Sequence, residues 1–232
     1  MKKLLFLTVT FFITLSCLWA QKTETIKVSG EEYPAFIANA QYKYPAYKKA
    51  KIVFKNGDIA SARLNYDYFN QTMKYIGEKG DTLIIANEED LHHISIGTDS
   101  FFYDNGYYEW IASSATARLA VKRVYKEGPR VLVGAFGTTS PAKNIESHTK
   151  ILTEHADSKE LSQNEVVTIS KETTYYISPI NDTKNNFVTA TRSNINRLFP
   201  KKNVEDFIKD NRLNLNKEED LIDLMVYISK PK

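Results

Sequence analysis

Two adjacent histidines behind a run of acids are the side chains of this 232-residue chain that come closest to a metal-ligand pattern. His92 and His93 follow Glu88, Glu89 and Asp90. Adjacent residues of a strand point to opposite faces, so both imidazoles cannot hold one ion unless the strand bulges. Asp90 and His92 share a face, but two ligands are fewer than a protein zinc site uses. We therefore keep Asp90 and His92 as metal candidates and favour a solvated turn that leads into a strand.

The sequence motifs of several catalytic classes are missing. The chain contains no G-x-S-x-G nucleophile elbow, no H-E-x-x-H helix, no P-loop and no dinucleotide fingerprint. Gly77 to Asp81 superficially resembles a phosphate-binding loop, but no helix pattern follows it, so we interpret it as a hairpin turn. Cys17 is the only cysteine, which excludes an intrachain disulfide. We expect no cofactor and assign no catalytic residue.

Paired carboxylates are the catalytic arrangement that the composition leaves open. A glycosidase needs two carboxyl groups about 5 to 10 Å apart, and spacing in the sequence does not define that distance. The candidates near expected strand ends are Asp90, Asp99, Asp104 and Glu109. A hydrolase that acts on envelope carbohydrate is therefore the alternative to a protein that only binds.

Aromatic and basic side chains are interleaved between residues 42 and 79. This segment contains eight Lys or Arg residues but only three acidic residues. In the favoured interpretation, alternate aromatic residues face the core and the lysines protect the wet or edge side of a sheet. If they are exposed instead, the same residues would suit glycans or lipid-linked anionic sugars. The candidate ligand surface consists of Tyr42, Tyr44, Tyr47 and Tyr68.

Part of this segment raises the question of nucleic acid. I-V-F-K-N-G-D at 52–58, A-R-L-N-Y-D at 62–67 and Met73 are similar to the strand-Gly-strand-Asp-Met pattern of Sm-like small barrels, and L-H-H-I-S-I-G at 91–97 is similar to their last strands. However, the formal net charge is only +3. With so little electrostatic attraction, we expect no nucleic-acid partner.

The N-terminus has the layout of a secretory signal peptide over residues 1–20. Lys2 and Lys3 precede an apolar run from Leu4 to Leu15, and small residues follow it. The run is shorter than the roughly 20 residues that cross a bilayer, and no second long apolar run occurs. We therefore expect an exported protein with no transmembrane span in the mature chain.

Residues 21–190 are expected to form a β-rich domain. Short β-branched and aromatic runs between turn residues are typical of an antiparallel sheet. The clearest hairpin is 51–66, where Asn56-Gly57 predicts a two-residue type I′ turn. We expect about ten strands in a meander, a sandwich or a partly open barrel, with two of them separated at Gly128-Pro129. A polar excursion over residues 137–165 interrupts the pattern.

A helical periodicity replaces the strand pattern over residues 191–232. Ser193, Asn203 and Asn216 suit the N-caps of three short helices. Because the last helix has an apolar face, it must pack on something. That apolar stripe consists of Leu221, Leu224, Met225 and Ile228.

Three further segments are V-F-K-N-G-D at 53–58, K-G-D-T-L at 79–83 and L-N-K-E-E-D-L at 215–221. In these segments the chain resembles uncharacterised exported proteins of the Bacteroidota, for which no activity is known. The resemblance extends over most of the mature length. It implies location and domain extent, and it implies no activity.

These patterns favour a non-catalytic binding or interaction module of the bacterial envelope, whose partner is an envelope protein or a glycan. The carbohydrate-active hydrolase with paired carboxylates is the first alternative. A small outer-membrane barrel is the second, but the helical pattern at the C-terminus replaces the membrane strand that such a barrel needs there.

The two processing routes predict different mature proteins. Cleavage after Ala20 gives a periplasmic or secreted protein that begins at Gln21, whereas acylation of Cys17 gives an outer-membrane lipoprotein. We expect the first route, because Thr14 fits a lipobox poorly. The intact mass of the protein isolated from its own cell envelope will match a chain that starts at Gln21. A mass that includes an acylated Cys17 would contradict this expectation.

Overall fold

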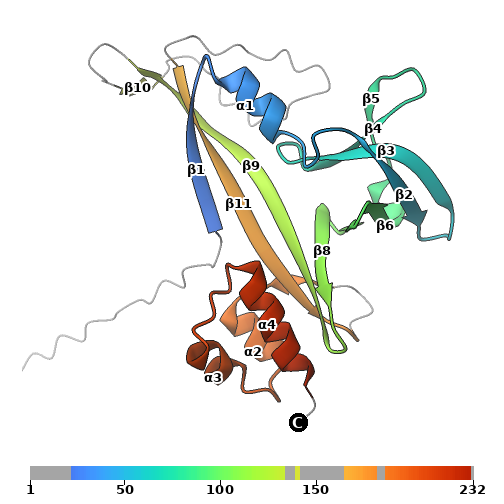
Figure 1. The fold of residues 1–232 in the computed structure, drawn as a ribbon, viewed down its shortest axis with the longest axis vertical. Coiled ribbons are helices and arrows are strands. Elements are labelled where there is room, and N and C mark those ends of the chain that lie inside the picture. The colour runs from blue at the N-terminus through green and yellow to red at the C-terminus, as the bar shows by residue number, and fades with distance from the viewer. Residues whose placement is uncertain (1–21, 134–138, 142–164, 182–185, 231–232) are drawn as a thin grey trace, which may run out of the picture.

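The computed structural model describes residues 22–133, 139–141, 165–181 and 186–230 (Figure 1). The expected signal peptide at 1–20, with Cys17 and Ala20, lies outside these residues, as do Gln21 and most of the polar excursion at 137–165. The helices are α1 (Tyr33–Ala40), the 3₁₀ turn η1 (Glu88–Asp90), α2 (Arg192–Leu198), α3 (Val204–Asp210) and α4 (Glu218–Ser229).

Twelve strands of the described residues form one antiparallel sheet that does not close on itself. Their hydrogen-bonded order is β1-β11-β9-β8-β7-β6-β2-β3-β4-β5, with β10 beside β9 and β12 beside β11. The expected mainly β fold with C-terminal helices is thus confirmed, and its sheet is open. The strands are β1 (Lys22–Ser29), β2 (Lys48–Phe54), β3 (Ile59–Asp67), β4 (Thr72–Ile76), β5 (Thr82–Ile84), β6 (Leu91–Ile96), β7 (Asp99–Tyr103), β8 (Tyr107–Ser113), β9 (Ala117–Val133), β10 (Thr139–Pro141), β11 (Glu165–Pro179) and β12 (Val188–Thr189).

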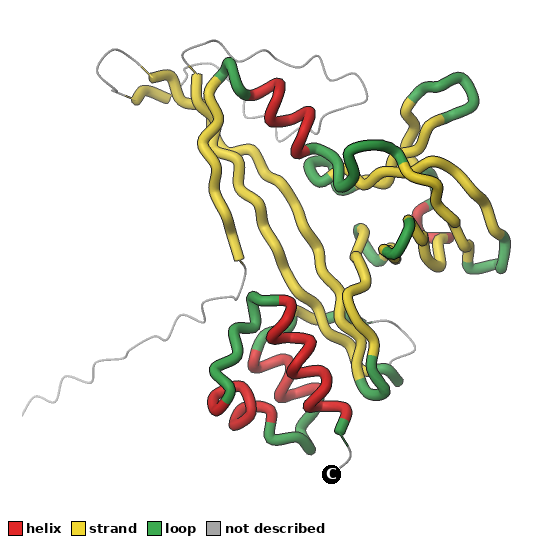
Figure 2. The backbone as a smooth tube through the Cα atoms, in the orientation of Figure 1, coloured by secondary structure: helices red, strands yellow, loops and turns green. Residues whose placement is uncertain are grey.

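The expected break at Gly128-Pro129 is wrong, because β9 runs through both residues for 17 residues. Val167 pairs with Arg130 and Ile169 pairs with Glu127, so two residues of β9 oppose one residue of β11. A bulge of this kind accepts a proline, which has no N–H to donate to the ladder. The result is the long β9–β11 pair that Figure 2 shows between the two helical ends of the molecule.

The hairpin between β2 and β3 is present as expected, but its turn type differs. Phe54 N donates to Asp58 O, and Gly57 N donates to Phe54 O, which leaves a three-residue loop. Gly57 has φ +92°, whereas Asn56 is not among the residues with positive φ. A type I′ turn needs positive φ at both central residues, so this loop is the longer hairpin with glycine at the left-handed position.

The β9–β11 pair has two faces with different surroundings. We call the side that carries Leu119, Val121, Tyr175 and Ile177 the inner face, and the opposite side the outer face. The inner residues belong to one buried cluster with the C-terminal helices. Further along the same face, α1 and neighbouring aromatic rings cover a second small cluster around Val167 and Ile169. A third cluster fills the curled sheet of β2 to β8.

Helix α1 was not expected, because the sequence pattern there suggested strands. Pro34 lies in its first turn, where proline is tolerated, and no residue of the helix is fully buried. Its rings Tyr33 and Phe36 pack against the inner face beside Tyr125. Helix α1 is therefore stabilised by covering apolar strand residues. With only eight residues, it is too short to show a clear helical periodicity in the sequence.

The three C-terminal helices follow the expected order, with different caps at two of them. Thr191 rather than Ser193 caps α2, and its hydroxyl accepts from Asn194 N. Asn203 is the N-cap residue of α3 as expected, and α4 begins after Lys217 rather than Asn216. The expected stripe of α4 is buried in the cluster that includes Leu119 and Val121.

Leu224 tests whether this packing holds the helices to the sheet. Its side chain is 0% exposed, so Leu224→Ala removes buried methyl groups and leaves a cavity, at a cost of about 2 to 5 kcal/mol. Chemical denaturation measures this change in the free energy of unfolding. Val226 on the same helix is 54% exposed, and Val226→Ala serves as the control with a change below about 0.5 kcal/mol. If both variants change the free energy of unfolding by the same small amount, α4 does not pack on the sheet as described.

Candidate functional site

The metal candidates Asp90 and His92 occupy an irregular part of β6. His93 pairs with Val53 and Leu91 pairs with Phe54, so His92 is the extra residue of a bulge. The bulge brings the Nδ1 atoms of His92 and His93 to 2.7 Å. The two imidazoles therefore meet only because the strand bulges, a contact that a regular strand would not allow.

This histidine pair lacks the rest of a metal site. The part of the chain that the structure describes contains no group of three His, Cys, Asp or Glu residues that could hold a metal ion. Burial and the neighbouring His92 lower the pKa of His93. The main-chain oxygen of Asp90 accepts from Lys55 N. The contacts that the structure gives these residues are those of a hydrogen-bonded turn.

The structure brings together two of the four candidate carboxylates. Lys43 Nζ lies 2.7 Å from Glu109 Oε1 and 3.4 Å from Asp99 Oδ2. The hydroxyl of Tyr44 donates to Asp99 Oδ2 at 2.6 Å. Neither Asp90 nor Asp104 takes part in these contacts. Asp99 and Glu109 are thus a pair of carboxylates joined by one cation.

The same contacts continue through β9 to the last helix. Arg123 lies 2.8 Å from the second oxygen of Glu109 and 3.0 Å from Glu218 Oε2. Although burial alone would raise it, the hydrogen bond from Tyr44 and the charge of Lys43 hold the pKa of Asp99 below its ordinary value. A general acid needs the opposite shift. This charge network is therefore suited to joining β7, β8, β9 and α4.

The candidate tyrosine surface separates into two parts. Tyr44 is 7% exposed and belongs to the core of the curled sheet. Tyr68 packs edge-on against Tyr66 at 5.5 Å between ring centroids. Tyr42 and Tyr47 are half-buried, with their centroids 5.7 Å apart. The four rings therefore do not form one ligand platform, and the core interpretation holds for Tyr44.

A larger set of rings gathers on the outer face, where the C-terminal helices do not pack. Phe102 of β7 lies directly opposite Tyr108 of β8, and Trp110 follows two residues later on the same face. Trp110 pairs with Ala120 of β9, which in turn pairs with Tyr176 of β11. Register therefore places side chains from four strands on one surface.

We call this set the outer aromatic cluster and define it as Phe102, Tyr108, Trp110, Tyr176 and Phe187. Phe102 lies at its centre, with ring centroids 5.2 Å from Tyr108, 4.6 Å from Trp110 and 4.9 Å from Phe187. Tyr176 meets Tyr108 edge-on at 4.9 Å. Phe102 is buried and the other four rings are half-buried, so Phe102 forms the floor and the others form the rim.

Two cations lie against these rings. The Arg118 guanidinium is 5.9 Å from the centroid of Trp110, and it donates to the carbonyl oxygen of Pro179. Lys122 Nζ is 5.5 Å from the centroid of Tyr108. Cations over ring faces are attracted by the ring quadrupole. The outer aromatic cluster therefore offers flat apolar faces beside positive charge.

Sequence reasoning missed this cluster for an identifiable reason. The alternation of Tyr108 and Trp110 was visible and gave the correct strand. The strand order, which brings Tyr176 beside them, is not encoded in local alternation. Phe187 lies in a polar stretch that we interpret as a connection between strands, so no sequence pattern indicates that its ring joins the cluster.

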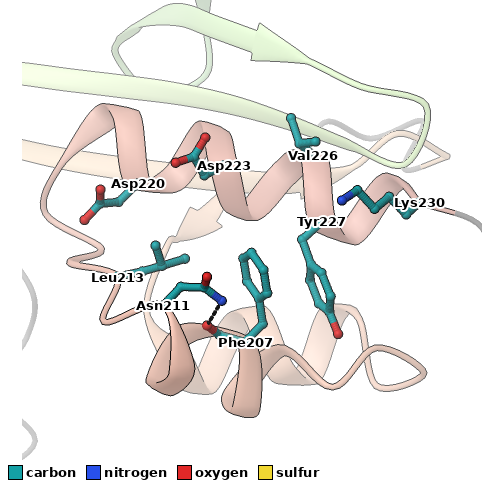
Figure 3. Close-up of a pocket in the computed structure, with 8 residues that line it drawn as sticks. All are labelled: Phe207, Asn211, Leu213, Asp220, Asp223, Val226, Tyr227 and Lys230. Carbon is teal, nitrogen blue, oxygen red and sulfur yellow. Dashed lines mark hydrogen bonds between the residues drawn. The ribbon is translucent and has the colours of Figure 1, made fainter.

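The helical part has a groove of its own between α3 and α4 (Figure 3). The rings of Phe207 and Tyr227 stack there with centroids 4.0 Å apart. Asp220 lies on the rim and already accepts from Asn214 N at 2.7 Å. The groove presents Asp220, Asp223 and Lys230 around a small aromatic floor.

Comparison of the chain with protein-family models, curated proteins and solved structures gives no match. Within the described residues, no helix has the length and apolar character needed to cross a bilayer.

Glu109 is the residue through which the charge network can be tested. Glu109→Gln keeps the shape of the side chain but removes the charge shared by Lys43 and Arg123, which are both largely buried. Because hydrogen bonds to charged groups are among the stronger ones, we expect a loss of about 1.5 to 3 kcal/mol in the free energy of unfolding.

The matched control is Glu205→Gln, which removes an exposed ion pair with Arg192. Exposed pairs contribute about 0 to 1 kcal/mol, so this variant should unfold close to the parent. Urea denaturation at neutral pH compares the two variants. Equal midpoints would show that the network around Glu109 contributes no more than a surface pair.

Proposed function

We propose that this chain is an exported, non-catalytic binding module of the bacterial envelope, and that its ligand surface is the outer aromatic cluster. One observation carries the proposal: rings from three strands and one connection converge on a sheet face that the helices leave uncovered, with Arg118 and Lys122 of a fourth strand against them. Trp, Tyr and Arg dominate the binding energy of recognition surfaces, because they combine large apolar area with polar groups.

Export is supported by the N-terminal sequence alone. The charged start, the apolar run and the Ala20-Gln21 junction are typical of a cleaved signal peptide. The resemblance to exported proteins of the Bacteroidota agrees with this location. The periplasmic or secreted form is the first choice, and an outer-membrane lipoprotein acylated at Cys17 is the alternative.

Binding is better supported than hydrolysis by the state of the carboxylates. A glycosidase keeps one carboxyl group protonated at working pH and leaves both groups open to the sugar. In this protein each oxygen of Glu109 contacts a cation, and Asp99 is held in its charged form by Tyr44 and Lys43. This arrangement favours charge pairing over proton transfer.

A glycan suits the outer aromatic cluster better than a protein does. A protein interface of standard size buries about 800 Å² on each partner. Four half-buried rings around a buried one expose much less than that. Flat rings with polar edges match the apolar faces and hydroxyl groups of a few sugar units. An envelope glycan is therefore the proposed ligand class.

Trp110→Ala tests the location of the surface. A central aromatic residue of a binding surface contributes about 2 kcal/mol or more, so we expect affinity to fall by more than about tenfold. An array of bacterial envelope oligosaccharides identifies the binding glycan, and titration calorimetry measures the affinity. Phe187→Ala, which removes a second ring of the cluster, should act in the same direction.

Tyr42→Ala is the matched control, because Tyr42 is a half-buried ring outside the cluster. Its affinity should equal that of the parent protein, while circular dichroism confirms that each variant is folded. A loss of binding in Tyr42→Ala with no loss in Trp110→Ala would move the surface to the tyrosines. Binding of an envelope protein and of no glycan would overturn the proposed ligand class.

A further inference from the structure

The charge of Lys122 is not compensated within the described part of the chain. Its side chain is half-buried on the outer face and forms no hydrogen bond or ion pair there. Burial lowers the pKa of Lys122 from its ordinary value. By contrast, Lys126 lies on the same face of β9 and pairs with Glu172 at 2.6 Å. Lys122 is therefore the cation of this face that is available to a ligand.

The position of Lys122 is defined by its neighbours. Its Nζ lies over the Tyr108 ring at 5.5 Å. A Cβ atom at Gly106 would lie 2.6 Å from the same Nζ, so the absence of a side chain there leaves room for the ammonium group. Asp104, in the turn between β7 and β8, is exposed and forms no ion pair with Lys122. The ammonium group thus lies at the edge of the aromatic surface.

An anionic ligand group would remove the cost of this arrangement. An ammonium group withdrawn from water without a partner is unfavourable, and an anion that reaches it forms a short, charge-assisted hydrogen bond. The rings beside Lys122 would hold the apolar face of the same ligand. A neutral sugar would contact only the aromatic rings, whereas an acidic sugar would contact the rings and pair with Lys122.

We infer that the outer aromatic cluster binds an acidic glycan, with the sugar rings against Tyr108 and Trp110 and an anionic group of the glycan paired with Lys122. This inference rests on the proposed function and specifies its ligand class. The anionic group is a carboxylate or a phosphate monoester, since either one can pair with an ammonium group.

The experiment compares probes that share a skeleton and differ in charge. Trigalacturonic acid is the acidic probe, and its fully methyl-esterified form is the neutral one. Maltotriose phosphate and maltotriose form the second pair and distinguish phosphate from carboxylate. Calorimetry at low salt should show at least tenfold tighter binding of one acidic probe than of its neutral partner, and the difference should shrink at high salt.

Lys122→Met is the decisive variant, because Met keeps the apolar stem over Tyr108 and loses the charge. It should bind the acidic probe as weakly as the neutral one, and its thermal unfolding temperature should be no lower than that of the parent protein, because the variant removes an unpaired charge. Lys126→Met is the matched control on the same strand face and should retain the preference. Trp110→Ala should weaken both probes.

The outcomes separate the inference from the proposed function. If the neutral probe binds as tightly as the acidic one, the acidic ligand class is wrong and the binding surface stands. If Lys122→Met keeps the preference for the acidic probe, the pairing with Lys122 is wrong, which overturns the inference and leaves the binding surface in place. If no glycan binds the folded protein, both are overturned. If hexaglutamate binds as tightly as the acidic sugar, the surface recognises charge alone, which also overturns the inference.

Discussion

The long pairing of β9 with β11 is the constraint on which the rest of the fold depends. Its inner face carries fully buried residues such as Leu119 and Ile177, which a two-stranded ribbon cannot shield from water by itself. Other parts of the chain must therefore shield these inner-face residues from water. The C-terminal helices supply it at one end, and α1 supplies it towards the other.

Between these two covers, the inner face of β9 carries a charge. Arg123 follows Val121 and precedes Tyr125 on that face, and it lies where the helical cover meets the curled sheet. A charge at such a junction is unfavourable unless it is paired. Glu109 and Glu218 pair with it, and Lys43 and Asp99 extend the pairing. The junction therefore requires complementary charges from strands, a loop and a helix, which favours one relative placement of these elements.

Local patterns in the sequence predicted the elements better than their arrangement. The alternation around Asn56-Gly57 and the stripe from Leu221 to Ile228 each depend on neighbours in the chain, and both elements are present. The bulges are different, because a bulge depends on how a strand meets its partner. The one at Gly128-Pro129 lets β9 continue where two separate strands were expected, and the one at His92 brings together two imidazoles that a regular strand would direct to opposite faces.

The candidate site could be predicted only in part, because it too depends on how the strands pair. Asp99 and Glu109 were identifiable as chemistry-bearing residues, but only the strand order reveals that each has a cation beside it. The outer aromatic cluster depends on the pairing of β8 with β9 and of β9 with β11, which joins Trp110 to Tyr176 across Ala120. Long-range register is not written in local alternation, so rings more than sixty positions apart in the chain could not be grouped in advance.

The two faces of the β9–β11 pair are linked by this geometry. Because helices bury the inner face, the strand segments that carry Trp110 and Tyr176 are held in a packed sheet before any ligand arrives. Side chains on such a scaffold lose little further freedom on binding, which lowers the entropic cost of recognition. The small residues Ala120 and Ser178 are fully buried on the outer side, so the rings above them approach the sheet closely. The buried inner face thus pre-organises the outer one, and the proposed binding surface, although made of few rings, would gain specificity because the sheet beneath it is already in place.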